Sequence, residues 1–109
     1  RLVAARLDGV DGKALRQVGE RMKAQDEALV AVIAAAAGPK ALLLVAASKA
    51  AVARGVKAGQ LVGNLAAHVG GRGGGKPDLA QAGGSDVNGI DAALAAAAEA
   101  VRDALGASV

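Results

Sequence analysis

The stretch that decides the fold runs from residue 28 to residue 47 and reads ALVAVIAAAAGPKALLLVAA. It holds two apolar runs, Leu29 to Ala36 and Leu42 to Ala47, separated by Gly38-Pro39-Lys40. A membrane-spanning helix needs roughly 20 uninterrupted apolar residues, and the Gly-Pro-Lys break falls in the middle of this stretch. Short continuous apolar runs are typical of strands covered on both faces. We therefore expect a hairpin of two antiparallel buried strands, and no membrane partner.

Toward the N-terminus, the sequence predicts one strand and one helix. Residues Leu2 to Leu7 alternate weakly between apolar and polar, as a strand does. Asp11 follows a turn signal and is expected to cap a helix that runs to about Asp26. The apolar positions of that helix recur three and four residues apart, at Leu15, Val18 and Met22.

Toward the C-terminus, the pattern predicts two further helices and one short strand. Lys57 to Val69 has the spacing of an amphipathic helix, and Gly70 is expected to end it. Leu79 to Ala82 follows a glycine-rich loop and predicts a short strand. Asn88 is expected to cap the last helix, with Asp91 three residues on as in a capping box.

These elements follow one another as strand, helix, strand, strand, helix, strand, helix. Residues 1–109 are thus predicted to form a single globular α/β domain, a mixed sheet of about four strands with about three helices. The 109 residues include no Phe, Trp, Tyr or Cys, so the core must be built from small and aliphatic side chains. The absence of cysteine excludes disulfides and thiolate metal sites, and we expect a cytoplasmic location.

The charge is unevenly distributed along the chain. The net charge is only +3, but no Asp or Glu occurs between Ala28 and Pro77. The cations in that stretch are Lys40, Lys49, Arg54, Lys57, Arg72 and Lys76. A segment with one sign of charge is typical of a protein with an anionic partner. Because the chain has no aromatic residue, base stacking on ring platforms is unavailable, which argues against the usual sequence-specific recognition of single strands. A nucleic-acid partner would be held by backbone charge, by shape or by an arginine plane.

The glycine-rich loop after the second predicted helix resembles a phosphate-binding motif only in part. Gly70 to Lys76 matches GxxxxGK, but Pro77 stands where a P-loop needs Ser or Thr. The loop also leaves a helix, whereas a P-loop leaves a strand, so we expect no ATP site. Two interpretations stay open: an anion-binding nest of glycine amides with Arg72 and Lys76, or a lid or close backbone crossing.

Catalytic and metal-binding residues are not predicted. His68 is the only histidine and is expected at the edge of the second helix, so a metal site lacks ligands. Ser48 or Ser85 would be needed for a serine triad, and neither is flanked by a nucleophile-elbow pattern. We therefore expect no enzyme activity from this chain.

Residues 57–84 read KAGQLVGNLAAHVGGRGGGKPDLAQAGG, which closely resembles the signature region of the C-terminal, DHH-associated domain of alanyl-tRNA synthetases. The likeness extends more loosely over nearly the whole chain. It implies a non-catalytic domain of a larger synthetase that binds alanine-specific tRNA at its elbow and helps couple aminoacylation to editing. It also implies that ATP and zinc belong to other domains of the parent enzyme.

The resemblance and the charge pattern predict the same surface. We expect Arg72, Lys76 and the amides of Gly71, Gly73, Gly74 and Gly75 to contact RNA backbone, with Lys57 and Gln81 nearby. Glycine would let the main chain approach the ligand closely. A structural role for Gly73 to Gly75, packing against the sheet, is the competing interpretation.

Two other functions stay open from the sequence. One is the substrate-binding lobe of a DHH-type phosphoesterase, although Lys76-Pro77 replaces the glycine-histidine ending of that lobe. The other is a pure interaction or dimerisation module. In the family, a helical segment that can mediate dimerisation usually precedes this domain, and the present chain starts almost directly on its first strand. A homodimer is therefore expected, if at all, in the full-length protein.

Overall fold

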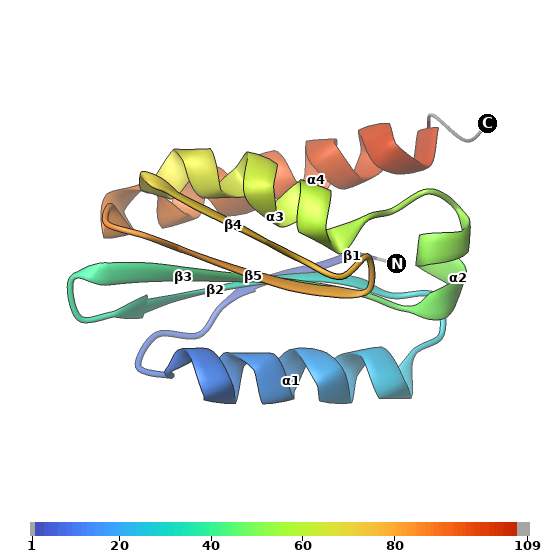
Figure 1. Ribbon diagram of the computed structural model, residues 1–109, viewed down its shortest axis with the longest axis horizontal. Helices are drawn as coiled ribbons and strands as arrows, with labels where there is room; N and C mark the ends of the chain where they lie inside the picture. The colour runs from blue at the N-terminus through green and yellow to red at the C-terminus, as the bar shows by residue number, and fades with distance from the viewer. Residues whose placement is uncertain (1, 107–109) are drawn as a thin grey trace.

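The computed structural model describes residues 2–106, with side chains up to residue 102. It has one mixed five-stranded sheet with helices on both faces (Figure 1). The order of strands across the sheet is β1-β2-β3-β5-β4, which places β1 and β4 at the two edges. The elements in chain order are β1 (Leu2–Arg6), α1 (Gly12–Gln25), β2 (Val30–Ala37), β3 (Lys40–Ala47), α2 (Lys49–Ala53), α3 (Ala58–Ala66), η1 (Ala67–Val69), β4 (Gly71–Gly75), β5 (Leu79–Gly84), η2 (Val87–Gly89) and α4 (Ile90–Gly106).

The predicted central hairpin is confirmed. Strands β2 and β3 pair antiparallel, from Val30 opposite Ala47 to Ala37 opposite Lys40. Gly38 at the turn has φ +61°, a left-handed conformation that glycine adopts without steric cost. Most of both strands is buried, because helices cover both faces of the sheet, and this is why their sequences are apolar without alternation.

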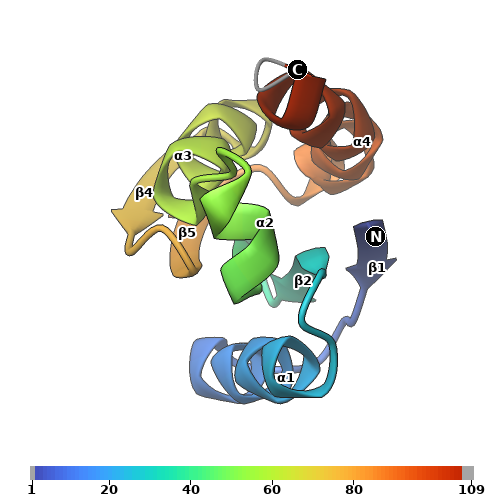
Figure 2. The same cartoon turned by 90° about the vertical axis from the view of Figure 1, so that its right-hand side faces the viewer.

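Helix α1 covers one face of the sheet, and α3 and α4 cover the other (Figure 2). The core is correspondingly divided into two clusters. On the α1 side, Leu15 packs with Ile33 and Leu44. The larger cluster lies under α3 and α4, where many of the buried residues are alanine and valine. Small side chains let helices and strands approach closely, which compensates for the absence of aromatic residues.

The structure adds elements to those predicted and corrects one of the two predicted helix caps. Most of the glycine loop forms a fifth strand, β4, and a short fourth helix, α2, follows the central hairpin. The predicted cap at Asn88 is wrong: Asp86 accepts a 3.0 Å hydrogen bond from the Asn88 amide and caps η2, which leads into α4. The Asp11 cap of α1 is confirmed by a 2.8 Å bond from the Ala14 amide.

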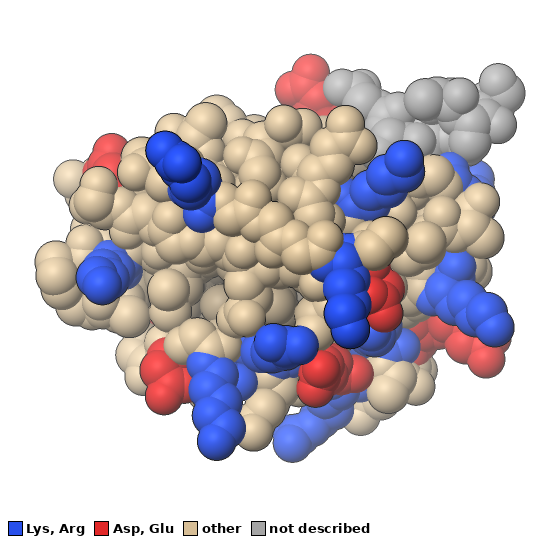
Figure 3. Space-filling view, viewed as in Figure 1, with Lys and Arg blue, Asp and Glu red and all other residues tan. Residues whose placement is uncertain are grey.

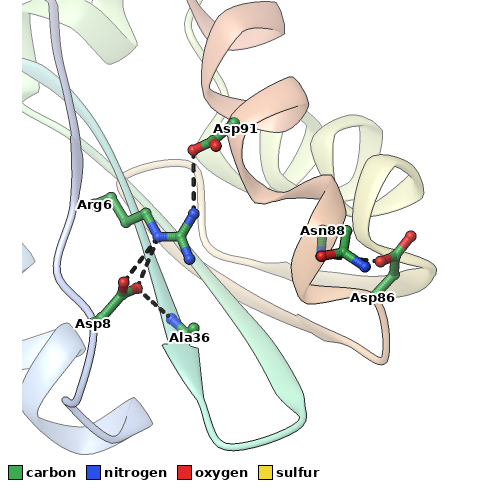
Figure 4. Close-up of polar contacts among 6 residues, drawn as sticks. All are labelled: Arg6, Asp8, Ala36, Asp86, Asn88 and Asp91. Carbon is green, nitrogen blue, oxygen red and sulfur yellow. Dashed lines mark hydrogen bonds and ion pairs between the residues drawn. The ribbon is translucent and has the colours of Figure 1, made fainter.

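The edge strand β1 is tied to the rest of the fold by a polar cluster (Figure 4). Arg6 Nε donates to Asp8 at 2.9 Å, and its Nη1 donates to Asp91 of α4 at 3.2 Å. The Asp8 carboxylate also accepts a 3.0 Å bond from the Ala36 amide of β2. These donors, the Arg6 side chain above all, lower the pKa of Asp8. Asp91, which was predicted to take part in a capping box, instead accepts the hydrogen bond from Arg6.

Candidate nucleic-acid interface

The glycine-rich segment forms an edge hairpin with β5. Gly71 to Gly75 pair antiparallel with Gly84 to Ala80, and the Lys76 amide donates to the Leu79 carbonyl at 3.1 Å across the turn. An amide nest requires successive residues in alternating helical conformations, so the extended strand rules out that interpretation. The alternative of a close backbone crossing is the one that the structure confirms.

Three glycines of β4 are required by contacts inside the protein. A Cβ added to Gly73 would lie 2.5 Å from the Ala82 Cα, and one added to Gly71 would lie 2.5 Å from the Gly84 Cα. At Gly75 the added atom would lie 2.8 Å from the Ala80 Cα. Real Cβ atoms do not approach this closely, so the strand can lie against β5 only without side chains at these positions.

Helix α3 packs on one face of the sheet, over β4 and β5, and its contacts with β4 are also made through glycines (Figure 2). A Cβ on Gly59 would lie 2.7 Å from the Gly75 carbonyl oxygen, and one on Gly63 would lie 3.6 Å from that of Gly73. In an antiparallel ladder alternate residues direct their amides to the partner strand. The Lys76 to Leu79 bond therefore assigns the amides of Arg72 and Gly74 to β5, whereas those of Gly73 and Gly75 point away from β5, toward the outer edge of the sheet.

The opposite face of the hairpin forms a groove with α1. Gln81 Nε2 donates to the Gly12 carbonyl at 2.8 Å and so holds β5 against the first turn of the helix. Beside this contact lies a cavity of about 230 Å³. Its lining is Arg16, Gly74, Gly75, Lys76, Leu79, Ala80 and Gln81. Gln81 therefore has a structural bond, in addition to its predicted place near the glycines.

The two predicted cations of the hairpin are exposed. Among the side chains that the structure describes, neither Arg72 nor Lys76 forms an ion pair. The nearest acid to the turn, Asp78, is bound by Lys23 of α1 at 2.8 Å. That hydrogen bond is the main reason why the pKa of Asp78 is lowered, and the charge of Lys76 adds a smaller effect. Lys23 thus neutralises the carboxylate and leaves Lys76 available.

Lys57 lies at the same end of the molecule as the hairpin turn. It is the exposed residue before α3, and the next amide, that of Ala58, donates to the Pro77 carbonyl at 2.8 Å. Figure 3, in the view of Figure 1, shows a largely uncharged surface in the middle, over β4 and β5, with Lys and Arg and some Asp and Glu side chains around it. The fold therefore places Lys57 beside the hairpin turn that carries Lys76.

Arg16 is a lining residue that the sequence did not indicate. It lies outside the acid-free stretch, and its neighbour Glu20 forms a weak pair with it at 3.8 Å. The available signal is helical spacing: Gly12, Arg16 and Lys23 share one side of α1, and the structure directs that side toward β5 and its turn. Only the contacts of α1 with β5 reveal which side faces the hairpin.

The candidates for catalysis have structural roles or lack partners. The Ser48 hydroxyl is buried and donates to the backbone carbonyls of Asp26 and Lys23. His68 is exposed at the end of α3, in η1, as expected. Within the described part of the chain, no group of three or more His, Asp or Glu residues is placed to hold a metal ion. The same residues include no helix long and apolar enough to cross a membrane.

The fold and this surface define an α/β domain of about 100 residues with a glycine-rich edge hairpin between cations. A model of the DHHA1 domain family matches residues 1–103, and the chain belongs to this family. The family resemblance inferred from the sequence is thereby confirmed.

The relatives are alanine–tRNA ligases. That of Delftia acidovorans is 47% identical over 95 residues, which cover 87% of this chain and 11% of the ligase. That of Xanthomonas campestris pv. campestris strain B100 is 42% identical over 106 residues, covering 97% of the chain and 12% of the ligase. The chain thus spans about a ninth of the length of these relatives.

A solved structure supports the same relationship. The crystal structure of the C-Ala domain from Aquifex aeolicus alanyl-tRNA synthetase matches with a TM-score of 0.83 at 26% identity. The match covers 90% of this chain and 87% of that domain. This match confirms the single α/β domain that the sequence predicts.

The internal contacts of β4 predict opposite effects for adjacent glycines. Gly73→Ala should destabilise the domain by about 1–3 kcal/mol, because the new methyl group overlaps Ala82. Gly74→Ala should be neutral or stabilising by up to about 1 kcal/mol, because nothing lies within 4 Å of the added atom and its φ is not positive. Urea denaturation of both variants measures the difference; equal stabilities would contradict the register of the hairpin.

The Lys23–Asp78 pair predicts a pH-dependent stability. Since the folded pKa of Asp78 lies below its ordinary value of 3.8, its stabilisation is present above that pH and lost as the pH falls through the folded value. Asp78→Asn should cost at most about 1 kcal/mol at neutral pH, because both groups are partly exposed, and nothing in strong acid. Urea midpoints across this pH range test the effect. In a Lys23→Met background the pH-dependent difference should largely vanish, and its persistence would assign it to another group.

Proposed function

We propose that this chain is a tRNA-binding C-terminal domain of an alanyl-tRNA synthetase. In this proposal it contacts the elbow of alanine-specific tRNA and helps to couple aminoacylation to editing in the parent enzyme. ATP and zinc would be bound by other domains, with which this domain would interact in the cytoplasm. The relatives support the proposal because all those described above are alanine–tRNA ligases or a domain of one.

The observation that carries the proposal is the pair of exposed cations on a hairpin with little side-chain bulk. Arg72 and Lys76 bracket Gly73 to Gly75, and the described side chains offer neither of them an ion-pair partner. Unpaired cationic side chains beside exposed backbone favour contact with phosphates. Such contacts require no base stacking and do not depend on the base sequence. Lys57 adds charge at the turn, and Gln81 would fix the distance between the hairpin and α1.

A double variant tests the contact with phosphates. Arg72→Ala with Lys76→Ala should weaken binding of the chain to tRNA at least about tenfold at low salt, because two charge-assisted contacts are lost. The slope of log K against log salt should fall by about 2. Filter binding over a series of salt concentrations measures both quantities.

The matched control removes the same charge elsewhere. Arg21 and Arg102 are exposed and lie on α1, on the side turned away from Gly12 and Arg16, and on α4, so replacing both by Ala should change affinity little. Equal effects of the two double variants would show that only net charge matters. An acceptor-stem minihelix that binds as tightly as whole tRNA would contradict the elbow contact.

A further inference from the structure

The glycines of the hairpin divide into those that the protein requires and those that it does not. Gly71, Gly73 and Gly75 of β4 are required by close contacts with β5. Gly84 of β5 is required as well, because an added Cβ there would meet Val69. Gly74 is different, because nothing lies within 4 Å of its added Cβ. At Gly83 the nearest atom is the Ala41 carbonyl oxygen at 3.8 Å, an ordinary contact. Neither Gly74 nor Gly83 has a positive φ.

These two glycines therefore have no explanation inside the domain. Glycine in a strand costs about 0.5–1 kcal/mol relative to alanine, because more backbone freedom is lost on folding. Where no turn, left-handed conformation or internal contact needs it, a strand glycine often marks a site where a ligand or another backbone approaches closely. Both residues are exposed, and both lie in the edge hairpin of β4 and β5.

Gly74 and Gly83 share one face of the sheet. Gly74 is opposite Gln81 and Gly83 is opposite Arg72, and paired residues point to the same side. The bond from Gln81 to Gly12 identifies that side as the one covered by α1. We call Gly74 and Gly83 the bare strip. It lies on the face opposite to the glycines that pack toward Ala80 and Ala82.

The bare strip is bordered by cations from two elements. The register places Arg72 beside Gly83 on this face, and Lys76 lies two residues beyond Gly74. Arg16 of α1 lines the same cavity as Gly74 and Lys76. Its Glu20 partner is 3.8 Å away with both side chains more than half exposed, so this pair is weak and easily exchanged for a stronger anion.

We propose that a phosphodiester backbone lies on the bare strip, in the groove between α1 and the β4–β5 hairpin, and that Arg16 is a further phosphate-binding residue. This inference rests on the proposed tRNA binding and assigns it to one face of the hairpin. The ligand approaches the α1 face, because α3 covers the other face of β4, with Gly59 and Gly63 against its backbone. Contact is made by cations and by close approach to Cα atoms.

Adding bulk to the bare strip tests the direction of approach. Gly74→Val and Gly83→Ala, made separately, should each leave the urea midpoint unchanged or raised. Both should weaken tRNA binding by the 109-residue chain, and the valine variant should weaken it roughly tenfold. The matched control is Ala4→Val, which adds the same kind of bulk to exposed β1 at the other edge of the sheet. That control should bind tRNA as the unmodified chain does.

Removing charge from α1 tests the new residue independently of any change in the hairpin. Arg16→Ala should lower the salt slope of tRNA binding by about 1 and weaken binding several-fold. Arg21→Ala removes the same charge from the same helix on the side turned away from the groove, and should have a much smaller effect.

The outcomes separate this inference from the proposed function. If Arg72→Ala with Lys76→Ala weakens binding but Gly74→Val, Gly83→Ala and Arg16→Ala do not, the tRNA contact stands and its assignment to the α1 face is wrong. If the unmodified chain binds no tRNA at any salt concentration, both proposals are overturned. If Gly74→Val lowers stability, Arg16→Ala against Arg21→Ala decides, and equal slopes for those two overturn the inference.

Discussion

The structure depends on how closely one strand of bare backbone can approach its neighbours. Strand β4 fits between β5 and α3 because Gly73 and Gly75 leave no side chain toward β5, and Gly59 and Gly63 leave none toward the strand. A chain without aromatic residues has little area per side chain to bury, so distance between elements must be short. Glycine at these contacts is the means, and its conformational cost is offset by the packing that it permits.

This arrangement separates two uses of glycine that look identical in the sequence. On the side of Ala80 and Ala82 the glycines of β4 are fixed by internal contacts. On the α1 side, an added Cβ would meet nothing within 4 Å at Gly74 and only an ordinary 3.8 Å contact at Gly83. The internal set builds the hairpin, and the other set leaves its outer face flat. Because the residues alternate along each strand, one glycine-rich segment serves both the packing of the fold and the shape of its surface.

Much of the fold was predictable, because its periodicities are strong. The strands of the hairpin at residues 29–47 are buried on two faces, so their sequences are continuously apolar. The helix from Lys57 is buried on one face, so its apolar residues recur with helical spacing. The strand GRGGG was not predictable, because it has no apolar alternation and glycine has low strand propensity. Its conformation comes from pairing with β5. Arg16 was missed for a similar reason: proximity to Lys76 exists only after α1 has packed across the sheet.

The charges of the surface are as much a product of internal pairing as of composition. Asp78 is the acid closest in sequence to Lys76, and a free carboxylate there would repel a phosphate from the turn. Lys23 removes that repulsion by binding Asp78 at 2.8 Å, from a helix that holds four bases and one acid. Arg6 acts similarly toward Asp8 and Asp91 at the opposite edge. The acid-free stretch from Ala28 to Pro77 therefore keeps its positive field, since the carboxylate that follows it is already neutralised within the fold.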